Sequence, residues 1–318
     1  MDTSSHVIIG AGIAGLSFLD PVIAGHPELL PSIFFCTIMG SNAPDIDFLY
    51  KYKGNDHYVK EHRGSSHSLY AQVFLALLIG GSAALVNGGT FFATFFFWTF
   101  LAVLLHVLFD ICNIYGTQGF RPFTNKWIAL NILPVFDPVI ISLHIIGFLL
   151  WVNGFPPQRI FLLVYAIILV YLVLRLYVKQ RVYRQIIGES DSGIEITLIP
   201  TVRLGRWGVI ASCNEQFKLG KYMNYDVVWS KILMKASSKN KIIQASRKNL
   251  FVHYLMKHSR FLHAKIINKK DGYEVHWFDL RLQSKIDEPY IAIIKLDKKL
   301  NLVNSRVKRG LISAPEKA

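Results

Sequence analysis

The stretch FFATFFFWTFLAVLLHVLFD, residues 91–110, decides how the rest of the chain is interpreted. Its apolar run, 91–109, is long enough to cross a bilayer as a helix, which takes about 17 to 25 residues. His106 and Asp110 stand at the end of this run, four positions apart, and therefore share one helix face. Because a polar ionisable group at membrane depth is costly, the stretch predicts a transmembrane helix that carries functional side chains.

Further apolar runs extend this interpretation to the first half of the chain. Hydrophobic residues make up 52% of the sequence, which is too much for an ordinary soluble protein. The other runs are 7–25, 71–88, 138–152 and 160–178, together with a shorter one at 31–43. We therefore predict a mainly α, polytopic transmembrane helical bundle of about six spans over residues 1–178.

The placement of lysine and arginine orients this bundle. Positive charges gather in segments 51–63, 121–126 and 175–184, whereas Arg159 stands alone in another connection. Short loops rich in Lys and Arg remain on the cytoplasmic side. With six spans, all three groups fall on one side, so we expect a multi-pass protein of the cell membrane with both termini cytoplasmic.

The second half of the chain has a different character. Residues 1–177 hold 8 Lys or Arg against 9 Asp or Glu, whereas residues 178–318 hold 27 against 12. Alternating apolar residues predict strands at 194–201, 273–282 and 290–296, and 248–261 fits an amphipathic helix. We predict a small, strand-rich α+β cytoplasmic domain over 179–318, whose basic surface favours membrane lipids. No nucleic-acid-binding motif accompanies the charge, so specific nucleic-acid binding is not expected.

Ionisable residues gather at one level of the predicted bundle. Each stands at the cytoplasmic end of a span, and the set is His6, Asp45, Asp47, His62, His67, His106, Asp110 and Asp137. This convergence is independent of the topology, which rests on Lys and Arg alone. Asp137 precedes Pro138 and equally fits a helix N-cap. His26, His57 and His144 have no partners at this level.

The residue types indicate a metal site. Neutral imidazole and carboxylate together suit zinc, with manganese or iron as alternatives, better than calcium or magnesium. Such a metal would activate water for hydrolysis, with Asp47 and His67 as candidate catalytic groups for proton transfer. Arg63 is expected to hold an anionic group such as a phosphate. A phospholipid ester would lie at this headgroup level.

The glycines of VIIGAGIAGL, residues 7–16, match the dinucleotide-binding fingerprint at Gly10, Gly12 and Gly15. That fold needs a second strand ending in an acidic residue about 20 positions on, and the chain is instead interrupted by Asp20-Pro21 and His26-Pro27. Glycines at this spacing also allow close packing of membrane helices. We favour helix packing; a flavoprotein would instead be yellow.

Several motifs together resemble a known family. They are His6, APDID at 43–47, HRGSSHS at 62–68, HVLFD at 106–110 followed by YGTQ, and FDP at 136–138. The set resembles the integral-membrane metal-dependent hydrolase family that includes YdjM, and its spacing is similar to that of zinc-dependent phospholipase C. The resemblance implies a helical membrane hydrolase with metal-site positions at His6, Asp45, Asp47, His62, His67, His106 and Asp110. Ser66 departs from the family's more frequent Thr but keeps the hydroxyl.

Two functions follow from this site. The first is a membrane-embedded metal-dependent hydrolase that acts on an ester or phosphoester, including one in a lipid. The alternative is a non-enzymatic, metal-binding regulatory membrane protein whose basic domain recruits a partner. An enzyme needs an open coordination position, whereas a structural site is closed.

Overall fold

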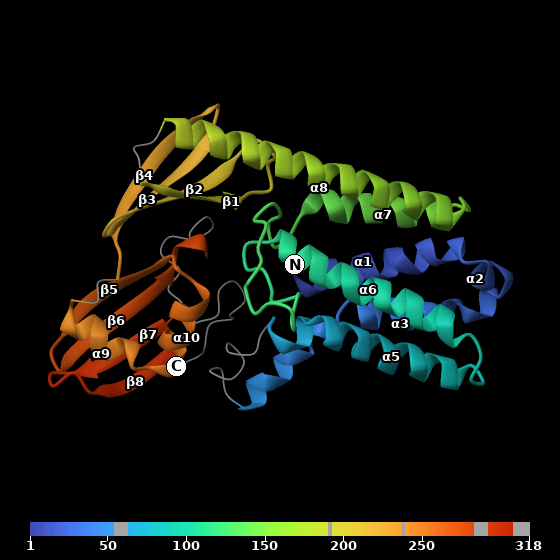
Figure 1. Ribbon diagram of the computed structural model, residues 1–318, viewed down its shortest axis with the longest axis horizontal. Helices are drawn as coiled ribbons and strands as arrows, with labels where there is room; N and C mark the ends of the chain where they lie inside the picture. The colour runs from blue at the N-terminus through green and yellow to red at the C-terminus, as the bar shows by residue number, and fades with distance from the viewer. Residues whose placement is uncertain (54–62, 190–192, 237–238, 283–291, 308–318) are drawn as a thin grey trace. The chain divides into compact units, whose positions relative to one another are not determined.

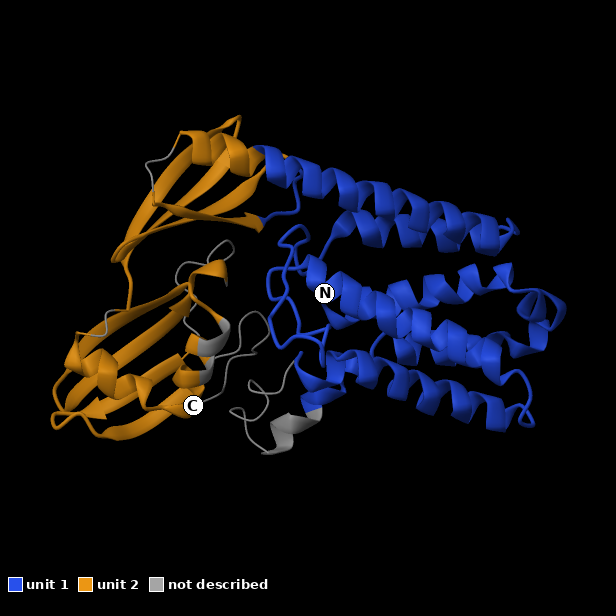
Figure 2. Ribbon diagram, in the orientation of Figure 1, with its two compact units in different colours: residues 1–49, 61–181, 200–204 blue, residues 50–60, 182–199, 205–318 orange. Residues whose placement is uncertain are grey.

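The chain forms two compact units. The computed structural model describes residues 1–53, 63–189, 193–236, 239–282 and 292–307. Unit 1 comprises residues 1–49, 61–181 and 200–204, and unit 2 comprises residues 50–60, 182–199 and 205–318 (Figure 2). Unit 1 is helical, and unit 2 contains the strands (Figure 1).

Unit 1 is built from long apolar helices joined by short helical segments. The α-helices are α1 (Thr3–Leu16), α2 (Pro21–Gly25), α3 (Leu30–Gly40), α5 (Leu69–Val86), α6 (Phe92–Cys112), α7 (Pro138–Val152) and α8 (Pro157–Gly188), the last of which runs on into unit 2. Between them lie the 3-10 helices η1 (Ser17–Leu19), η2 (Pro27–Leu29), η3 (Ala43–Lys53) and η4 (Ser65–His67).

Three described helices, α5, α6 and α8, are long and apolar enough to cross a membrane. The expected count of about six spans is therefore not supported. The other apolar segments, Thr3–Leu19, Pro27–Gly40 and Pro138–Val152, are shorter. Asp20 caps α2 and Pro27 opens η2, so the predicted run at 7–25 is divided into short pieces.

The glycines of residues 7–16 lie inside α1 and not in a turn between a strand and a helix. A Cβ atom added to Gly10 would collide with Ser41 of the chain segment after α3, and one added to Gly15 would collide with the Phe161 ring of α8. At Gly12 it would come within 2.6 Å of the His144 ring. These contacts confirm that the glycines serve helix packing.

Asp137 is confirmed as an N-cap, because its Oδ1 accepts hydrogen bonds from the N–H groups of Val139 (3.0 Å) and Ile140 (3.3 Å) at the start of α7. Its other oxygen accepts a 2.9 Å bond from the Tyr171 hydroxyl and lies 3.9 Å from Nη1 of the buried Arg175. Asp137 thus joins α7 to α8 instead of pointing to the other acidic residues.

Unit 2 contains two four-stranded antiparallel sheets (Figure 1). The first has the order β1 (Glu195–Pro200), β2 (Trp207–Cys213), β3 (Gln216–Met223), β4 (Asp226–Met234). The second has the order β5 (Leu262–Lys269), β6 (Gly272–Asp279), β7 (Ala292–Asp297), β8 (Leu302–Val307). The helices α9 (Lys241–Arg247) and α10 (Leu250–His258) pack with the second sheet, and Trp277 is fully buried there. The expectation of a C-terminal α/β region is confirmed.

Candidate metal centre

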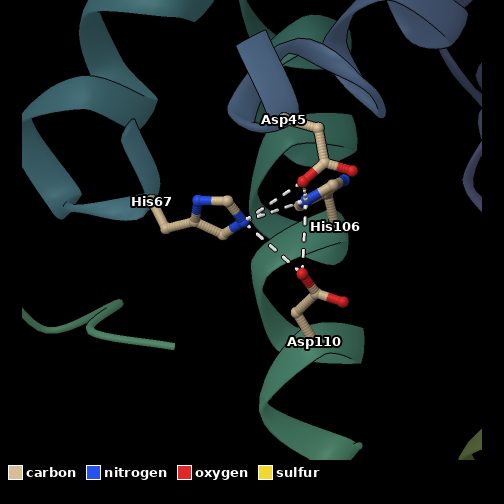
Figure 3. Close-up of side chains that lie close together, drawn as sticks. All are labelled: Asp45, His67, His106 and Asp110. Carbon is tan, nitrogen blue, oxygen red and sulfur yellow. Dashed lines mark hydrogen bonds and ion pairs between the residues drawn. The ribbon is translucent and has the colours of Figure 1, made fainter. Parts of the chain in front are cut away.

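Four of the predicted ligands meet at the end of α6. His106 and Asp110 lie one turn apart on that helix, Asp45 comes from η3, and His67 comes from η4 (Figure 3). One ligand atom from each residue lies within 4.8 Å of the other three. The i, i+4 spacing on α6 places His106 and Asp110 on one face, as the sequence predicted.

Five of the six distances between these atoms are close to the edge length of a metal coordination tetrahedron. His67 Nε2 lies 3.3 Å from His106 Nε2 and 3.4 Å from Asp110 Oδ2. His106 Nε2 lies 3.6 Å from Asp110 Oδ2, and Asp45 Oδ1 lies 3.7 and 3.8 Å from the two imidazole nitrogens. Four atoms at about 2.1 Å from a common centre with tetrahedral angles stand about 3.4 Å apart. The four residues therefore fit one ion of the size of zinc.

The hydrogen bond that each imidazole makes through Nδ1 determines its tautomer, and so whether Nε2 presents a lone pair to the centre. His106 Nδ1 lies 2.7 Å from the Ser41 carbonyl oxygen, which can only accept, so Nδ1 carries the proton. The Ser66 hydroxyl donates to Asp47 Oδ2 at 3.1 Å and therefore accepts from His67 Nδ1, 3.0 Å away. Both Nε2 atoms are then unprotonated and face each other, which a cation between them would stabilise.

One oxygen of each clustered carboxylate also has no hydrogen-bond donor among the described residues. Asp45 Oδ1 and Asp110 Oδ2 are buried and have no hydrogen-bond partner among the described residues. Buried carboxylates are otherwise paired or hydrogen-bonded, since desolvating an unpaired charge is costly. Two carboxylate oxygens and two imidazole lone pairs around one point form a donor set that fits a divalent cation.

His6 lies beside this cluster without being one of the four. Its ring stacks on that of His106 with centroids 3.8 Å apart, and its Nε2 lies 3.5 Å from Asp110 Oδ1. Neither ring nitrogen has a hydrogen-bond partner among the described residues, although the side chain is fully buried. His6 is therefore placed either to bind a metal ion at the centre or to accept a proton there.

Asp47 lies behind His67 and not among the four ligand atoms. Its Oδ2 accepts bonds from the Arg63 backbone N–H (2.8 Å) and from Ser66, and it stands 4.0 Å from His67 Nδ1, the nitrogen that faces away from the centre. A carboxylate in this place orients the imidazole and increases its basicity. His62, the other predicted ligand, lies outside the described residues.

Arg63 is held in a conformation that a non-glycine residue adopts only with strain. Its φ is 60°, in the left-handed region. Its carbonyl accepts bonds from Gln118 N (3.1 Å) and Thr117 Oγ1 (3.0 Å). The strained backbone directs the buried guanidinium to Asp110, with Nη2 3.3 Å from Oδ1. Burial alone would lower the pKa of Arg63, but the carboxylate of Asp110 raises it, so the group stays charged.

Two further groups contact Asp110 that the sequence pattern did not identify. Asn113 Nδ2 donates to Asp110 Oδ1 at 3.0 Å, and the α-amino group of Met1 contacts the same oxygen. Asn113 lies three residues after Asp110, and this helical spacing could have predicted the contact between them. The Met1 contact joins residues 109 positions apart and had no local signal.

Comparison with known proteins identifies the family of the chain that carries this site. A family model described as "YdjM inner membrane protein" matches residues 1–182, more than half of the chain. The chain belongs to this family. A second model, "YfhP C-terminal alpha/beta plait domain", matches residues 241–312. The "Uncharacterized protein YfhP" of Bacillus subtilis (strain 168) is 33% identical over 319 residues, covering 100% of this chain and 97% of that protein. No solved structure matches the chain.

Membership of this family confirms part of the resemblance seen in the sequence motifs. The matched region, 1–182, contains all four clustered residues and the three candidate spans begin within it. An inner membrane protein with a candidate metal-binding cluster is thus supported. The orientation of the termini and the number of passes stay predictions.

Access to the centre differs among the ligands. The side chains of His67, His106 and Asp110 are fully buried, whereas that of Asp45 is 23% exposed. A molecule that reaches the four-residue cluster would therefore approach on the side of Asp45. Ile46, the residue that follows Asp45 in η3, is about half exposed.

Proposed function

We propose that the chain is a membrane-embedded, metal-dependent hydrolase that acts on an ester or phosphoester of a membrane-associated molecule. The observation that carries this proposal is the set of four ligand atoms at tetrahedral spacing, two of them imidazole lone pairs that face each other at 3.3 Å. The donor set is best suited to zinc, with manganese and iron as alternatives.

Each protein group has a role in this chemistry. A divalent ion at the four ligands would supply Lewis acidity and lower the pKa of bound water. Arg63 would hold Asp110 in place and present its Nε, which is buried without an acceptor among the described residues, to an anionic group of the substrate. His6, whose ring nitrogens have no hydrogen-bond partner among the described residues, is the group placed to accept a proton. Asp47 and Ser66 would keep His67 in the tautomer that binds metal.

The exposed residues of the segment that carries Asp45 favour an amphiphilic substrate. Asp45 is followed in η3 by Ile46 and Phe48, each with 48% of its surface exposed. Exposed apolar residues that follow a metal ligand in the sequence suit a molecule with a hydrocarbon part and an anionic head. A lipid, or a lipid-like phosphoester, is therefore the substrate class that we infer.

One observation favours the alternative of a non-enzymatic metal-binding membrane protein. Four protein ligands fill a tetrahedron, which is the pattern of structural zinc sites, whereas catalytic sites usually keep one position for water. In that case the ion would stabilise the bundle, and the basic unit 2 would recruit a partner. The partial exposure of Asp45 is the feature that favours catalysis instead.

The two functions are separated by measuring metal and activity on the same preparations. The full chain, purified in detergent, is analysed for bound metals and assayed with soluble phosphomonoesters, phosphodiesters, carboxylic esters and phospholipids. Removal of metal by a chelator and its restoration with zinc, manganese or iron should abolish and restore hydrolysis. Bound metal without hydrolysis of any of these substrates would overturn the hydrolase proposal and favour the alternative.

A matched pair of variants links the activity to the cluster. His67→Ala removes a ligand, whereas His144→Ala removes another fully buried histidine that hydrogen-bonds the Ile140 carbonyl (2.8 Å) and lies outside the four. We expect loss of metal and activity in the first and retention of both in the second. Equal activity in the two variants would contradict the proposed role of the cluster.

A further inference from the structure

The last strand of the first sheet in unit 2 has an unusually apolar exposed surface. β4 hydrogen-bonds to β3 and ends the sheet order on that side (Figure 1). Trp229 is 46% exposed, Ile232 62%, Met234 55% and Val228 56%, and Tyr225 in the preceding turn is 77% exposed. These five residues form what we call the β4 edge.

Both faces of the strand contribute to this edge. Trp229 packs over Gly220 of β3, where an added Cβ would lie 2.9 Å from the indole ring. Ile232 is paired with Lys218 on the same face, and Val228 is paired with Lys221. The register shifts between Leu219 and Gly220, so the strand is bulged at this point. Aromatic and aliphatic side chains thus project around the free side of one strand.

Lysines border the β4 edge. Lys221 and Lys231 are exposed, and Lys218 and Lys235 are partly exposed. Lys218 and Lys221 come from the paired strand, Lys231 from β4 itself and Lys235 from the residue after it. The acidic residues nearby in sequence, Asp226 and Glu215, stand at the two ends of β4. The middle of the edge is therefore both apolar and positive.

We propose that the β4 edge docks on the headgroup region of an anionic lipid bilayer. Trp and Tyr side chains are favoured at membrane interfaces, and each nearby lysine strengthens binding to anionic lipid about fivefold. Unit 2 is joined to the candidate transmembrane helix α8, which would keep it close to a bilayer. This inference concerns a surface outside the four-residue cluster and does not depend on hydrolysis.

A second copy of the chain fits this edge less well. Antiparallel pairing of two β4 strands would bring their lysines together, and lysines on an edge strand are a known means of preventing such pairing. Lipid headgroups carry the opposite charge, which complements the lysines. The observations therefore favour an anionic membrane over self-association.

A fluorescent probe on β4 tests the proposal in the full chain. Ser230, exposed in the middle of β4, is replaced by Cys and labelled, in a background with Cys213→Ser; Cys36 and Cys112 are buried. The matched control carries the probe at Glu195→Cys in β1, at the opposite edge of the same sheet. Both proteins are placed in nanodiscs made of phosphatidylcholine alone or with phosphatidylglycerol, with and without lipids that carry a quencher.

The result expected is specific to one edge and to one lipid. Quenching by labelled lipid should be strong at position 230 in nanodiscs with phosphatidylglycerol, weaker in phosphatidylcholine or at high salt, and weak at position 195 throughout. Exchanging both Lys221 and Lys231 for Gln should lower the ratio of docked to undocked protein about 25-fold. Equal quenching at both positions, or no effect of lipid charge, would overturn the proposal. So would a probe signal at position 230 that depends on protein concentration and not on lipid, because it would indicate pairing of two copies.

Discussion

Replacing His106 by alanine tests the metal centre most directly. The substitution removes one of four ligands together with the hydrogen bond to the Ser41 carbonyl and the stacking on His6. It leaves the apolar residues of α6 unchanged, so insertion into the membrane should be retained. The three remaining ligand atoms stay in place, because they come from Asp45, His67 and Asp110.

The size of the effect follows from the number of ligands. Structural zinc binding is worth about 12 kcal/mol, so four equal ligands contribute about 3 kcal/mol each. Loss of one should weaken the metal Kd by about two orders of magnitude. A structural role of His106 in packing alone would leave the Kd unchanged and lower only the thermal stability.

The assay is a competition with a chelating indicator on the purified full chain in detergent, repeated for His144→Ala. His144 is as deeply buried as His106 but bonds to Ile140 and lies near Tyr165, 3.5 Å away. We expect about a 100-fold weaker Kd for His106→Ala and wild-type affinity for the control. An unchanged Kd in His106→Ala, with metal still bound in wild-type amount, would refute the assignment of this imidazole as a ligand.

Three other perturbations have expected outcomes. Asp47→Asn should weaken metal binding about tenfold without abolishing it, measured in the same competition assay, because the carboxylate supports His67 from behind. Arg175→Leu should destabilise unit 1 by about 3 kcal/mol or more in thermal unfolding, since it leaves the buried Asp137 without its cation. Burial alone would raise the pKa of Glu274, but the bond from Lys295 (3.2 Å) lowers it below the value in the unfolded chain. The carboxylate therefore stabilises the second sheet at pH values above its unfolded pKa. Glu274→Gln should therefore cost up to about 1 kcal/mol near neutral pH, and this difference should vanish as the pH falls through the folded pKa, measured by denaturation at several pH values.

Much of the site could be predicted from the sequence because its residues are rare at membrane depth. His106 and Asp110 interrupt an otherwise apolar run, and their spacing places them on one face of α6. Asp45 and His67 were identified by the same criterion, although they lie on 3-10 helices whose direction the sequence does not specify. Asp47 shows the limit of spacing, since a single residue separates it from Asp45 and yet it faces the opposite side of the His67 ring.

The number of spans was harder to predict for a physical reason. Hydropathy measures the apolar character of a run but not where hydrogen bonding within the helix ends. In the first run, the Asp20 side chain accepts from Val22 N at 2.9 Å and so begins a new helix inside an apolar segment. In the C-terminal half, alternation located three of the strands that the structure describes, β1, β6 and β7. The described strands pair with their neighbours along the chain, and the division into two sheets falls where α9 and α10 separate β4 from β5.

The charge of the centre connects its geometry with its function. Asp45, Asp47 and Asp110 bring three negative charges, and Arg63 brings one positive charge, so these side chains carry a net negative charge of two in a largely buried place. A divalent ion would neutralise that excess, which supports the view that the cluster holds metal and not protons alone. With metal bound, these charges would sum to zero, and the Arg63 guanidinium would remain as the local positive charge that attracts an anionic ester. We therefore expect phosphoesters to be hydrolysed in preference to neutral esters.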